Sequence, residues 1–499
     1  MSNIREFLIE VSNWVHDLSI KKIPLDSISH AKILFVDTLG AAIASLTTTH
    51  GKTLVSGFYN NINDIPIILP ALSILLDFDS TLLYYGHLGH GILASALYHA
   101  ISNETTGSEI IEAIVGASEI TSRIAASLAL SETRGQMMMP LHALSTAIML
   151  AKLSDQDPNT IVNAINHATS ILLKPLREGF ATISKTLIAF TGFNHGLNSF
   201  NLAKAVKSDN NLSFESFLKN WKGIIVKAPY GGLGKRWHIN TLSIKKYPAC
   251  SYAQTAIEAI LQIRENINPS EITQITVKEN LLTYHMDKTS EVLIRKGLRF
   301  PILQFFTPYL ISYTLIHGKP DPLIYEKEYI QDRDIWNLIA KTKFVHNLNL
   351  TSKLLKEPLP FSIAFKELNI PTKLYLLSRF GGLKALIMLR YPEIRKGRNI
   401  ESIDLDRTKK ILGVEIEVKT STTKYETRRE IVDGFHGTGL DKKWVVAFSK
   451  LSYLKMFISD DEFQHVVDIL RNLEKADYGE LNFIVRVIKK ALERSVKSA

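Results

Sequence analysis

The residues best suited to chemistry are crowded into one short segment, 76–93, which reads LDFDSTLLYYGHLGHGIL. Two carboxylates, one hydroxyl and two imidazoles lie within it: Asp77, Asp79, Thr81, His87 and His90. Carboxylates and imidazoles carry much of general acid–base catalysis, because their surroundings can tune their pKa values. The same residue types also cap helices and occupy turns, so a structural role for the segment is the competing interpretation.

Two other chemical interpretations of this segment are open. The order Asp77-Phe-Asp79-Ser-Thr81 matches the D-x-D-x-T nucleophile loop of haloacid-dehalogenase phosphatases, in which a carboxylate attacks phosphorus. That chemistry needs a parallel sheet, a later lysine and a pair of metal-binding acids, whereas the surrounding sequence is helical. His87 and His90 are spaced to share a metal ion, but no cysteine, glutamate or further histidine completes a recognisable set. We therefore expect no metal and no cofactor.

The segments around these residues follow a helical pattern. Apolar residues recur at helical spacing through roughly the first 220 residues. This periodicity predicts helices over 28–46, 92–101, 109–130, 141–153, 159–173 and 184–206. Asp157-Pro158 is typical of an N-cap followed by a first-turn proline. The loop 229–237 (PYGGLGKRW) lacks the G-x-G-x-x-G and GK[ST] phosphate motifs, so we expect a hinge there.

Beyond Lys245 the pattern changes to strands mixed with helices. Alternating residues predict strands over 272–277 and 414–418, the second paired with 425–431 as a hairpin, and helices are expected over 253–265 and 304–316. Ser459 and Glu462 form a capping box that begins a helical tail. We expect a mainly α fold with a smaller α+β domain. Its large helical domain is formed by residues 1–243 and 440–499, with an inserted α+β lid, 244–439, in which 350–412 follow no clear pattern and suggest an atypical insertion.

The composition limits the kind of protein. With 45% hydrophobic and 22% charged residues over 499 positions, the chain is typical of a globular protein. The net charge of +10 is scattered and comes with no nucleic-acid-binding motif, so we expect an anionic small molecule as partner instead of a nucleic acid. The single cysteine, Cys250, fits a reducing compartment such as the cytoplasm. Acidic residues near the start argue against a signal peptide, and the most apolar stretch, 65–76, is too short to span a membrane.

Several motifs, in order, resemble those of the MmgE/PrpD family. FVDTLGAAIA at 35–44 is similar to an early L-D-T-x-G helix of the family. DFDST, with His87 ten residues after Asp77, resembles a DFDDT-type segment followed by an active-site histidine. Arg134-Gly135 begins a segment that ends in AKL at 151–153. Further similar blocks are SKTLIAFTGFNHG at 184–196, LGKRWHINTLSIKKYPAC at 233–250 and FFTPYLISYTLIHG at 305–318.

The resemblance implies a cofactor-independent lyase, since the family includes 2-methylcitrate dehydratase and cis-aconitate decarboxylase. The expected substrate is a small hydroxy di- or tricarboxylate that loses water, which requires cations for the carboxylates, a base and an acid. The resemblance implies that the catalytic residues are His87, Lys185, Tyr309 and Asp77, and that the substrate-binding residues are Thr81, Arg134, Lys245 and Cys250. His87 is the expected acid–base group and Tyr309 the assisting acid. A homodimer is expected by analogy with the family.

The chain departs from the family pattern at positions that move protons. The family's R-G-[FW]-H continues here with Gln136 and three methionines, so its histidine is missing. Cys250 stands where decarboxylase-like members have a histidine, and Gln254 stands where many others have one. His142 is a candidate to compensate, with a plain helix-face position as the alternative. Of the reactions considered, decarboxylation of a cis-aconitate-like acid is the least expected, because its usual histidines are replaced here. The main alternative to dehydration is a member that binds a carboxylate without turnover or with altered specificity.

Overall fold

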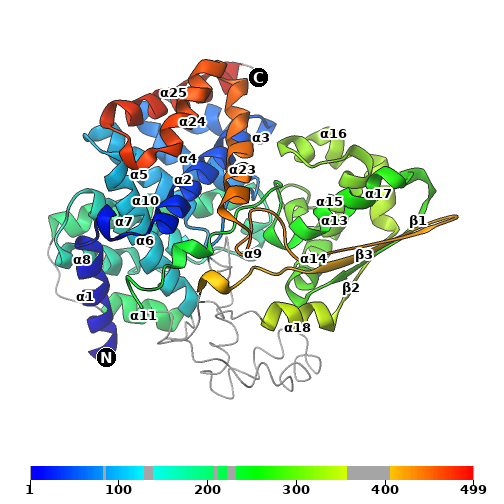
Figure 1. Ribbon diagram of the computed structural model, residues 1–499, viewed down its shortest axis with the longest axis horizontal. Coiled ribbons are helices and arrows are strands. Elements are labelled where there is room, and N and C mark those ends of the chain that lie inside the picture. The colour runs from blue at the N-terminus through cyan, green and yellow to red at the C-terminus, as the bar shows by residue number, and fades with distance from the viewer. Residues whose placement is uncertain are drawn as a thin grey trace.

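The computed structural model describes residues 2–82, 86–128, 139–206, 212–221, 232–356 and 405–497. Figure 1 shows helices from both ends of the chain gathered on one side, and a small sheet with its own helices on the other. The predicted fold class, mainly α with a smaller α+β part, is confirmed.

The larger part is built from helices. Its N-terminal members are α1 (Ser2–His16), α2 (Leu25–Ser45), α3 (Thr49–Phe58), α4 (Ile65–Leu75), α5 (Gly89–Ser102), α6 (Gly107–Ser127), α7 (Met139–Leu153), α8 (Pro158–Ala168), α10 (Thr186–Ala205) and α11 (Leu212–Asn220). Each predicted helix appears with its ends shifted by a few residues, because caps and not periodicity set helix ends. The Asp157 side chain accepts hydrogen bonds from the amides of Asn159 and Thr160, so the predicted N-cap of α8 is present.

The sequence pattern does not predict α3 and α4. In α4, Pro66 and Pro70 argue against a helix, although Pro66 lies in the first turn, where its missing amide has no intrahelical partner. The helix is apolar all round, which removes the periodicity that reveals an amphipathic helix. Almost all of α4 is buried, so its composition reflects a place inside the core.

The smaller part contains a four-stranded mixed sheet in the order β2-β1-β3-β4. β1 (Ile272–Glu279) pairs antiparallel with β3 (Val414–Thr420), which forms the predicted hairpin with β4 (Lys424–Arg429). β2 (Thr342–His346), which no alternation predicts, pairs parallel with β1. The helices of this part are α13 (Gln254–Ile263), α14 (Leu281–Arg295), α15 (Thr307–His317), α16 (Lys327–Ile330), α17 (Arg333–Ala340) and α18 (Leu348–Lys356). Buried side chains of α13 and α15 pack on one face of the sheet.

The helical tail packs on the N-terminal helices. It consists of α23 (Leu440–Leu451), α24 (Asp460–Arg471) and α25 (Tyr478–Lys497), and the predicted capping box of Ser459 and Glu462 begins α24. Leu451, Leu470 and Ile488 belong to the same buried cluster as the apolar residues of α2 and α5. One hydrophobic core therefore contains both ends of the chain, whereas the division at 243/244 and 439/440 stays a prediction.

Two predicted features fall largely outside the described residues. Of the expected hinge at 229–237, only 232–237 are described, and Gly232 and Gly234 adopt positive φ in a turn there. Of the expected insertion at 350–412, residues 357–404 lie outside the description. The hinge and the insertion stay predictions.

α2 is the one described helix that is long and apolar enough to cross a membrane by length and composition. However, 94% of its most apolar window is buried inside the protein. Such burial is typical of a core helix, and α2 packs against both α5 and the tail helix α23.

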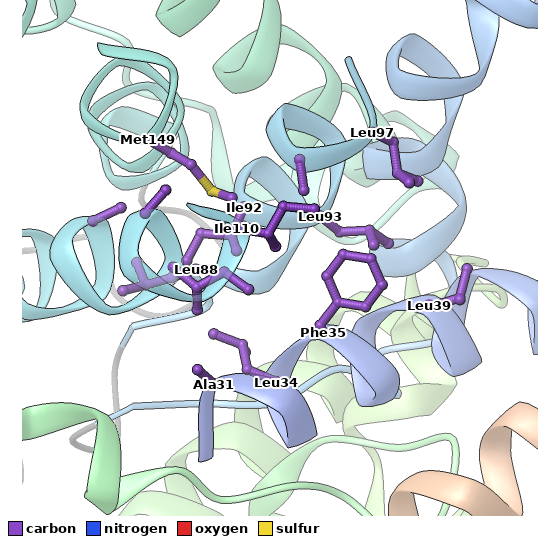
Figure 2. Close-up of a cluster of buried hydrophobic side chains, with 14 of the residues drawn as sticks. Ala31, Leu34, Phe35, Leu39, Leu88, Ile92, Leu93, Leu97, Ile110 and Met149 are labelled. Carbon is purple, nitrogen blue, oxygen red and sulfur yellow. The ribbon is translucent and has the colours of Figure 1, made fainter. Parts of the chain in front are cut away.

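Figure 2 shows the packing that fixes the start of α5. Phe35 and Leu39 of α2 lie in one cluster with Leu93 and Leu97 of α5, and Leu88 joins them just before the helix begins. All five side chains are at most 2% exposed. Because Leu88 directly follows the histidine of the DFDST-His87 motif, this core also determines where that histidine lies.

Ile92→Ala is expected to lower the free energy of unfolding by roughly 2–5 kcal/mol, because Ile92 is fully buried and the change leaves a cavity. Val445→Ala on α23 is the control: that side chain is 70% exposed, so a change of less than about 0.5 kcal/mol is expected. Urea unfolding followed by tryptophan fluorescence measures both. Equal losses in the two variants would contradict the place of Ile92 in the core.

Candidate functional site

The candidate site begins where α4 ends. Asp77 adopts a left-handed conformation, with φ 52°, which aspartate tolerates better than most residues. The residues that follow run through the interior, and Asp77, Asp79 and Thr81 are each at most 2% exposed. A helix and not a strand precedes Asp77, so the segment lacks the strand that the phosphatase interpretation requires.

A short antiparallel pairing joins this loop to the beginning of the α+β part. Thr81 and Ser243 exchange both backbone hydrogen bonds, each with an N–O distance of 2.8 Å. Continuing that register by two residues places Asp79 opposite Lys245. Backbone pairing therefore brings the carboxylates to this lysine, although 166 residues separate Asp79 from Lys245 in the sequence.

Four buried charged side chains form one connected cluster. Nζ of Lys185 lies 3.1 Å from Oδ1 of Asp77. Nζ of Lys245 lies 2.8 Å from Oδ2 of Asp77 and 3.2 Å from Oδ1 of Asp79. All four side chains are at most 2% exposed. Two carboxylates and two ammonium groups balance in charge, which makes their burial tolerable.

The pKa values of the cluster follow from competition between burial and pairing. Burial raises the pKa of each aspartate, but the nearby lysines, and His87 at Asp79, outweigh it, so both pKa values are lowered, that of Asp79 well below normal. Burial lowers the pKa of Lys245, yet the two aspartates together raise it above its ordinary value. At Lys185 burial prevails over Asp77, and the pKa is lowered. Lys185 is therefore the better proton donor of the two lysines.

His87 joins the cluster through Asp79. Its Nδ1 lies 2.6 Å from Oδ2 of Asp79, and Nε2 of His90 lies 3.2 Å from the same oxygen. Burial lowers the pKa of His87 although Asp79 raises it, so the ring is neutral at neutral pH. Because an ionised carboxylate only accepts hydrogen bonds, Nδ1 of His87 carries the proton and Nε2 keeps a lone pair.

His142, the predicted substitute for the missing histidine, lies behind His90. The two rings meet edge-on with centroids 5.2 Å apart, and His142 is 1% exposed. Within the described part of the chain, neither ring nitrogen of His142 has a hydrogen-bond partner. Burial first, then His90 and His87, lower its pKa well below the ordinary value. His142 is therefore an uncharged ring that packs against His90.

Gln304, which no sequence pattern singles out, fixes Lys185 in place. Its Oε1 accepts a hydrogen bond from Nζ of Lys185 (2.6 Å), and its Nε2 donates to the carbonyl of Leu75 at the end of α4 (2.7 Å). The Gln304 carbonyl accepts from the amide of Cys250 (2.9 Å). One glutamine thus joins the lysine, the helix end and the cysteine, and only the fold reveals it.

A second buried ion pair supports the loop from the tail. Nζ of Lys450 in α23 lies 2.5 Å from Oδ1 of Asp37 in α2 and also donates to the carbonyl of Phe78. Both side chains are fully buried. Burial raises the pKa of Asp37 to about 6, since Lys450 offsets it only in part. The aspartate of the 35–44 motif therefore positions the loop through the tail helix α23.

Two positions where the family has histidines hold groups that do not exchange protons near neutral pH. Burial, with Asp77 nearby, raises the pKa of Cys250 to about 12, so its thiol stays protonated. Gln254 stabilises the turn at residues 246–249. Its Oε1 accepts hydrogen bonds from the amides of Lys246 and Tyr247, and its Nε2 donates to the carbonyls of Tyr247 and Ala249. Gln254 therefore has a structural role.

The structure brings six of the predicted site residues together: Asp77, Thr81, His87, Lys185, Lys245 and Cys250. The hydroxyl of Tyr309 instead donates to the carbonyl of Ile324 at 2.5 Å. Tyr325 stacks on Tyr309. Burial raises the pKa of Tyr325, and Asp77 and Cys250 add to that rise, so Tyr325 is nearer to the cluster than Tyr309. Arg134 lies outside the described residues.

Asp79, His87 and His90 form the one set of three possible metal ligands among the described ranges, with ligand atoms within 4.8 Å of one another. Imidazole and carboxylate are suitable donors for several divalent ions. However, Asp79 is already paired with Lys245, and the charges of the cluster are balanced. A divalent cation would add uncompensated positive charge to a buried site. The three residues therefore fit acid–base chemistry better than metal binding.

The fold and the site define a mainly helical protein with a smaller α+β part and a buried centre of lysines, aspartates and histidines. The sequence profile of the MmgE/PrpD C-terminal domain matches residues 247–366. Together with the ordered motifs of the helical part, this match supports membership of the MmgE/PrpD family. No curated protein matches the chain.

Lys245→Met is expected to lower the free energy of unfolding by roughly 3–5 kcal/mol at neutral pH, because two buried carboxylates then share one ammonium group. The pH dependence is expected to invert as well. In the wild type the folded pKa values of Asp77 and Asp79 are lowered, so their stabilising effect is present above about pH 4 and is lost as the pH falls further. In the variant burial dominates and raises these pKa values, so stability increases as the pH falls from about 7 to about 5.

Thermal unfolding across this pH range measures the effect. Lys246→Met is the matched control, because Nζ of Lys246 forms a partly exposed ion pair with Glu258 (2.7 Å) and its loss is expected to cost less than about 1 kcal/mol. A Lys245→Met profile parallel to that of the wild type would contradict the charge balance described above.

Cys250 is the one cysteine in the sequence, so its alkylation by iodoacetamide reports on this residue alone. Because its pKa is raised to about 12, alkylation of the folded protein at about pH 8 is expected to be more than roughly tenfold slower than in urea. Mass spectrometry over time measures both rates. Alkylation at the unfolded rate in the folded protein would show that the thiol is exposed and ordinary.

Proposed function

We propose that this protein is a cofactor-independent lyase that removes water from a small hydroxy di- or tricarboxylate, similar to 2-methylcitrate, by acid–base elimination. The observation that carries the proposal is a neutral His87 held by Asp79 beside two ammonium groups. Membership of the MmgE/PrpD family supports a lyase at the level of the class. The ammonium groups of Lys185 and Lys245 can donate hydrogen bonds to the carboxylates of such a substrate, and its hydroxyl is the leaving group.

His87 acts as the base in this proposal. Its Nε2 lone pair takes a proton from the carbon next to a substrate carboxylate, and the electrons of that C–H bond form the new double bond. Asp79 keeps the ring oriented through Nδ1 and stabilises the imidazolium that forms. His90 lies behind that carboxylate: its Nδ1 forms a hydrogen bond with the hydroxyl of Ser73 (2.7 Å), and its Nε2 lies 3.2 Å from Oδ2 of Asp79.

Lys185 acts as the acid. As the C–O bond breaks, the departing hydroxyl takes a proton from the Lys185 ammonium group and leaves as water. The lowered pKa of Lys185 suits this step, whereas Lys245 holds its charge and stabilises the negative charge that develops on the substrate. Asp77 fixes both lysines. Tyr309 is the acid that the resemblance implies, but the bond from its hydroxyl to Ile324 makes Lys185 the better candidate.

The second candidate function is carboxylate binding without turnover. It is favoured by Cys250 and Gln254, since neither side chain exchanges protons near neutral pH where relatives carry histidines. Decarboxylation of a cis-aconitate-like acid is more distant, because it relies on the histidine that Cys250 replaces. The homodimer and the cytoplasmic location stay predictions.

His87→Gln is expected to reduce turnover of 2-methylcitrate or citrate by roughly 100- to 10,000-fold, because an amide can keep the hydrogen bond to Asp79 but is no base. Substrate binding is expected to remain. In the wild type kcat/KM should fall as the pH drops below the lowered pKa of His87, where the ring becomes protonated. Ultraviolet absorbance of the conjugated product measures turnover, and calorimetry measures binding.

His99→Gln is the matched control, because His99 lies on α5, the helix that follows His87, and its Nδ1 bonds to Thr105 away from the cluster. It should retain full turnover. Wild-type protein that binds these acids but releases neither water nor carbon dioxide would favour the binding function. Carbon dioxide from cis-aconitate would favour decarboxylation.

A further inference from the structure

We propose that Lys410 is a third amine of the substrate site and binds one carboxylate of a small polycarboxylate. The inference rests on the proposed function and deepens it, because it adds a binding residue that no motif indicates. It also specifies a feature of the substrate: a carboxylate that lies near Thr81 and Ser251, away from the carbon that His87 deprotonates.

The position of Lys410 is the geometric basis. The residue lies shortly before β3, and its Nζ donates to Oγ1 of Thr81 (2.7 Å) and to Oγ of Ser251 (3.2 Å). Thr81 is two residues from Asp79, and Ser251 directly follows Cys250. Lys410 is 1% exposed, and its Nζ lies 4.8 Å from the centroid of the Phe435 ring. A segment 159 residues beyond Ser251 thus places an amine beside the Asp77–Asp79 cluster.

Two of its partners are hydroxyls, which can donate as well as accept. When a carboxylate approaches, the hydroxyls of Thr81 and Ser251 can turn and donate to it while Nζ of Lys410 does the same. The three groups come from the loop after α4, the turn before α13 and the segment before β3. Their convergence gives one carboxylate three donors, as a specific anion site requires.

The charge of Lys410 depends on its neighbours. Burial first, then the ammonium of Lys245, lower its pKa to about 7, whereas the carboxylates of Asp79 and Asp77 raise it only in part. Among the described neighbours, His436 is itself neutral, since burial lowers its pKa to about 4. Lys185 and Lys245 are balanced by two aspartates. Because the pKa of Lys410 lies near neutrality, an anion bound at its Nζ would favour the charged form of the amine.

This arrangement predicts proton uptake on binding. Above about pH 7 the amine of the free protein is mostly neutral, and a carboxylate at Nζ raises its pKa, so binding draws a proton from solvent. At lower pH the amine is already charged and no proton is needed. The affinity for a polycarboxylate should therefore fall as the pH rises above about 7, and a monocarboxylate that does not reach Lys410 should lack this dependence.

The test uses calorimetric titration of the full chain with tricarballylate, a tricarboxylate that has no hydroxyl to lose. At about pH 8, two buffers of different ionisation enthalpy report the protons taken up. The wild type is expected to take up a proton, and Lys410→Met is expected to bind roughly tenfold or more weakly and without that uptake. Lys443→Met is the matched control, because Lys443 is also buried with a pKa lowered to about 7 but contacts Nε2 of His30 (2.9 Å). It should keep both affinity and uptake.

Thermal unfolding of each variant checks that the fold is retained. Wild-type affinity and uptake in Lys410→Met would overturn the inference and leave the proposed function standing. The same loss in Lys443→Met would also overturn it, since the effect would then belong to any buried amine. A wild type that binds neither tricarballylate nor citrate would overturn the proposed function, and this inference with it.

Discussion

Two buried carboxylates, those of Asp77 and Asp79, constrain the rest of this structure. A carboxylate in a protein interior is strongly unfavourable unless it is paired, and the pairing here comes from Lys185 and Lys245. These residues lie at the end of α4, in the turn before α10 and just after the Thr81–Ser243 bridge. The charges can therefore be buried only when the helical and α+β parts have both folded. Assembly of the candidate site and completion of the fold are the same event.

The same pairing gives chemically similar groups different properties. Lys245, between two aspartates, holds its proton firmly, whereas Lys185, beside one, releases it more readily. Asp79 orients His87 through Nδ1 and leaves Nε2 available as a base. Support comes from a distance as well, because Lys450 of the tail helix α23 pairs with Asp37 and donates to the carbonyl of Phe78 in the loop. The tail of the chain is thus part of the site's framework, although it supplies none of the proposed reacting groups.

The departures from the family pattern leave this charged centre intact. Cys250 and Gln254 remove two groups that could move protons, but they do not disturb the balance of Asp77, Asp79, Lys185 and Lys245. In the proposed function this centre recognises a polycarboxylate, and the chemistry falls to His87 and Lys185, with Lys410 as the proposed further anion-binding group. A change of substrate or of reaction is compatible with such a site, because binding and proton transfer depend on different residues.

The sequence alone determined which segments form most of the helices and strands, and it indicated most of the residues of the candidate site. Helical periodicity, the Asp157 and Ser459 caps and the alternating strands at 272–277 and 414–418 are local features, so they can be read without a fold. The ordered motifs pointed to Asp77, His87, Lys185 and Lys245 for the same reason. Only the tertiary structure decided that Gln304, Lys410 and Lys450 belong with them and that the hydroxyl of Tyr309 is engaged by Ile324. Those contacts join residues tens to hundreds of positions apart. Burial and pairing, which set their pKa values, are properties of the packed chain and of no segment within it.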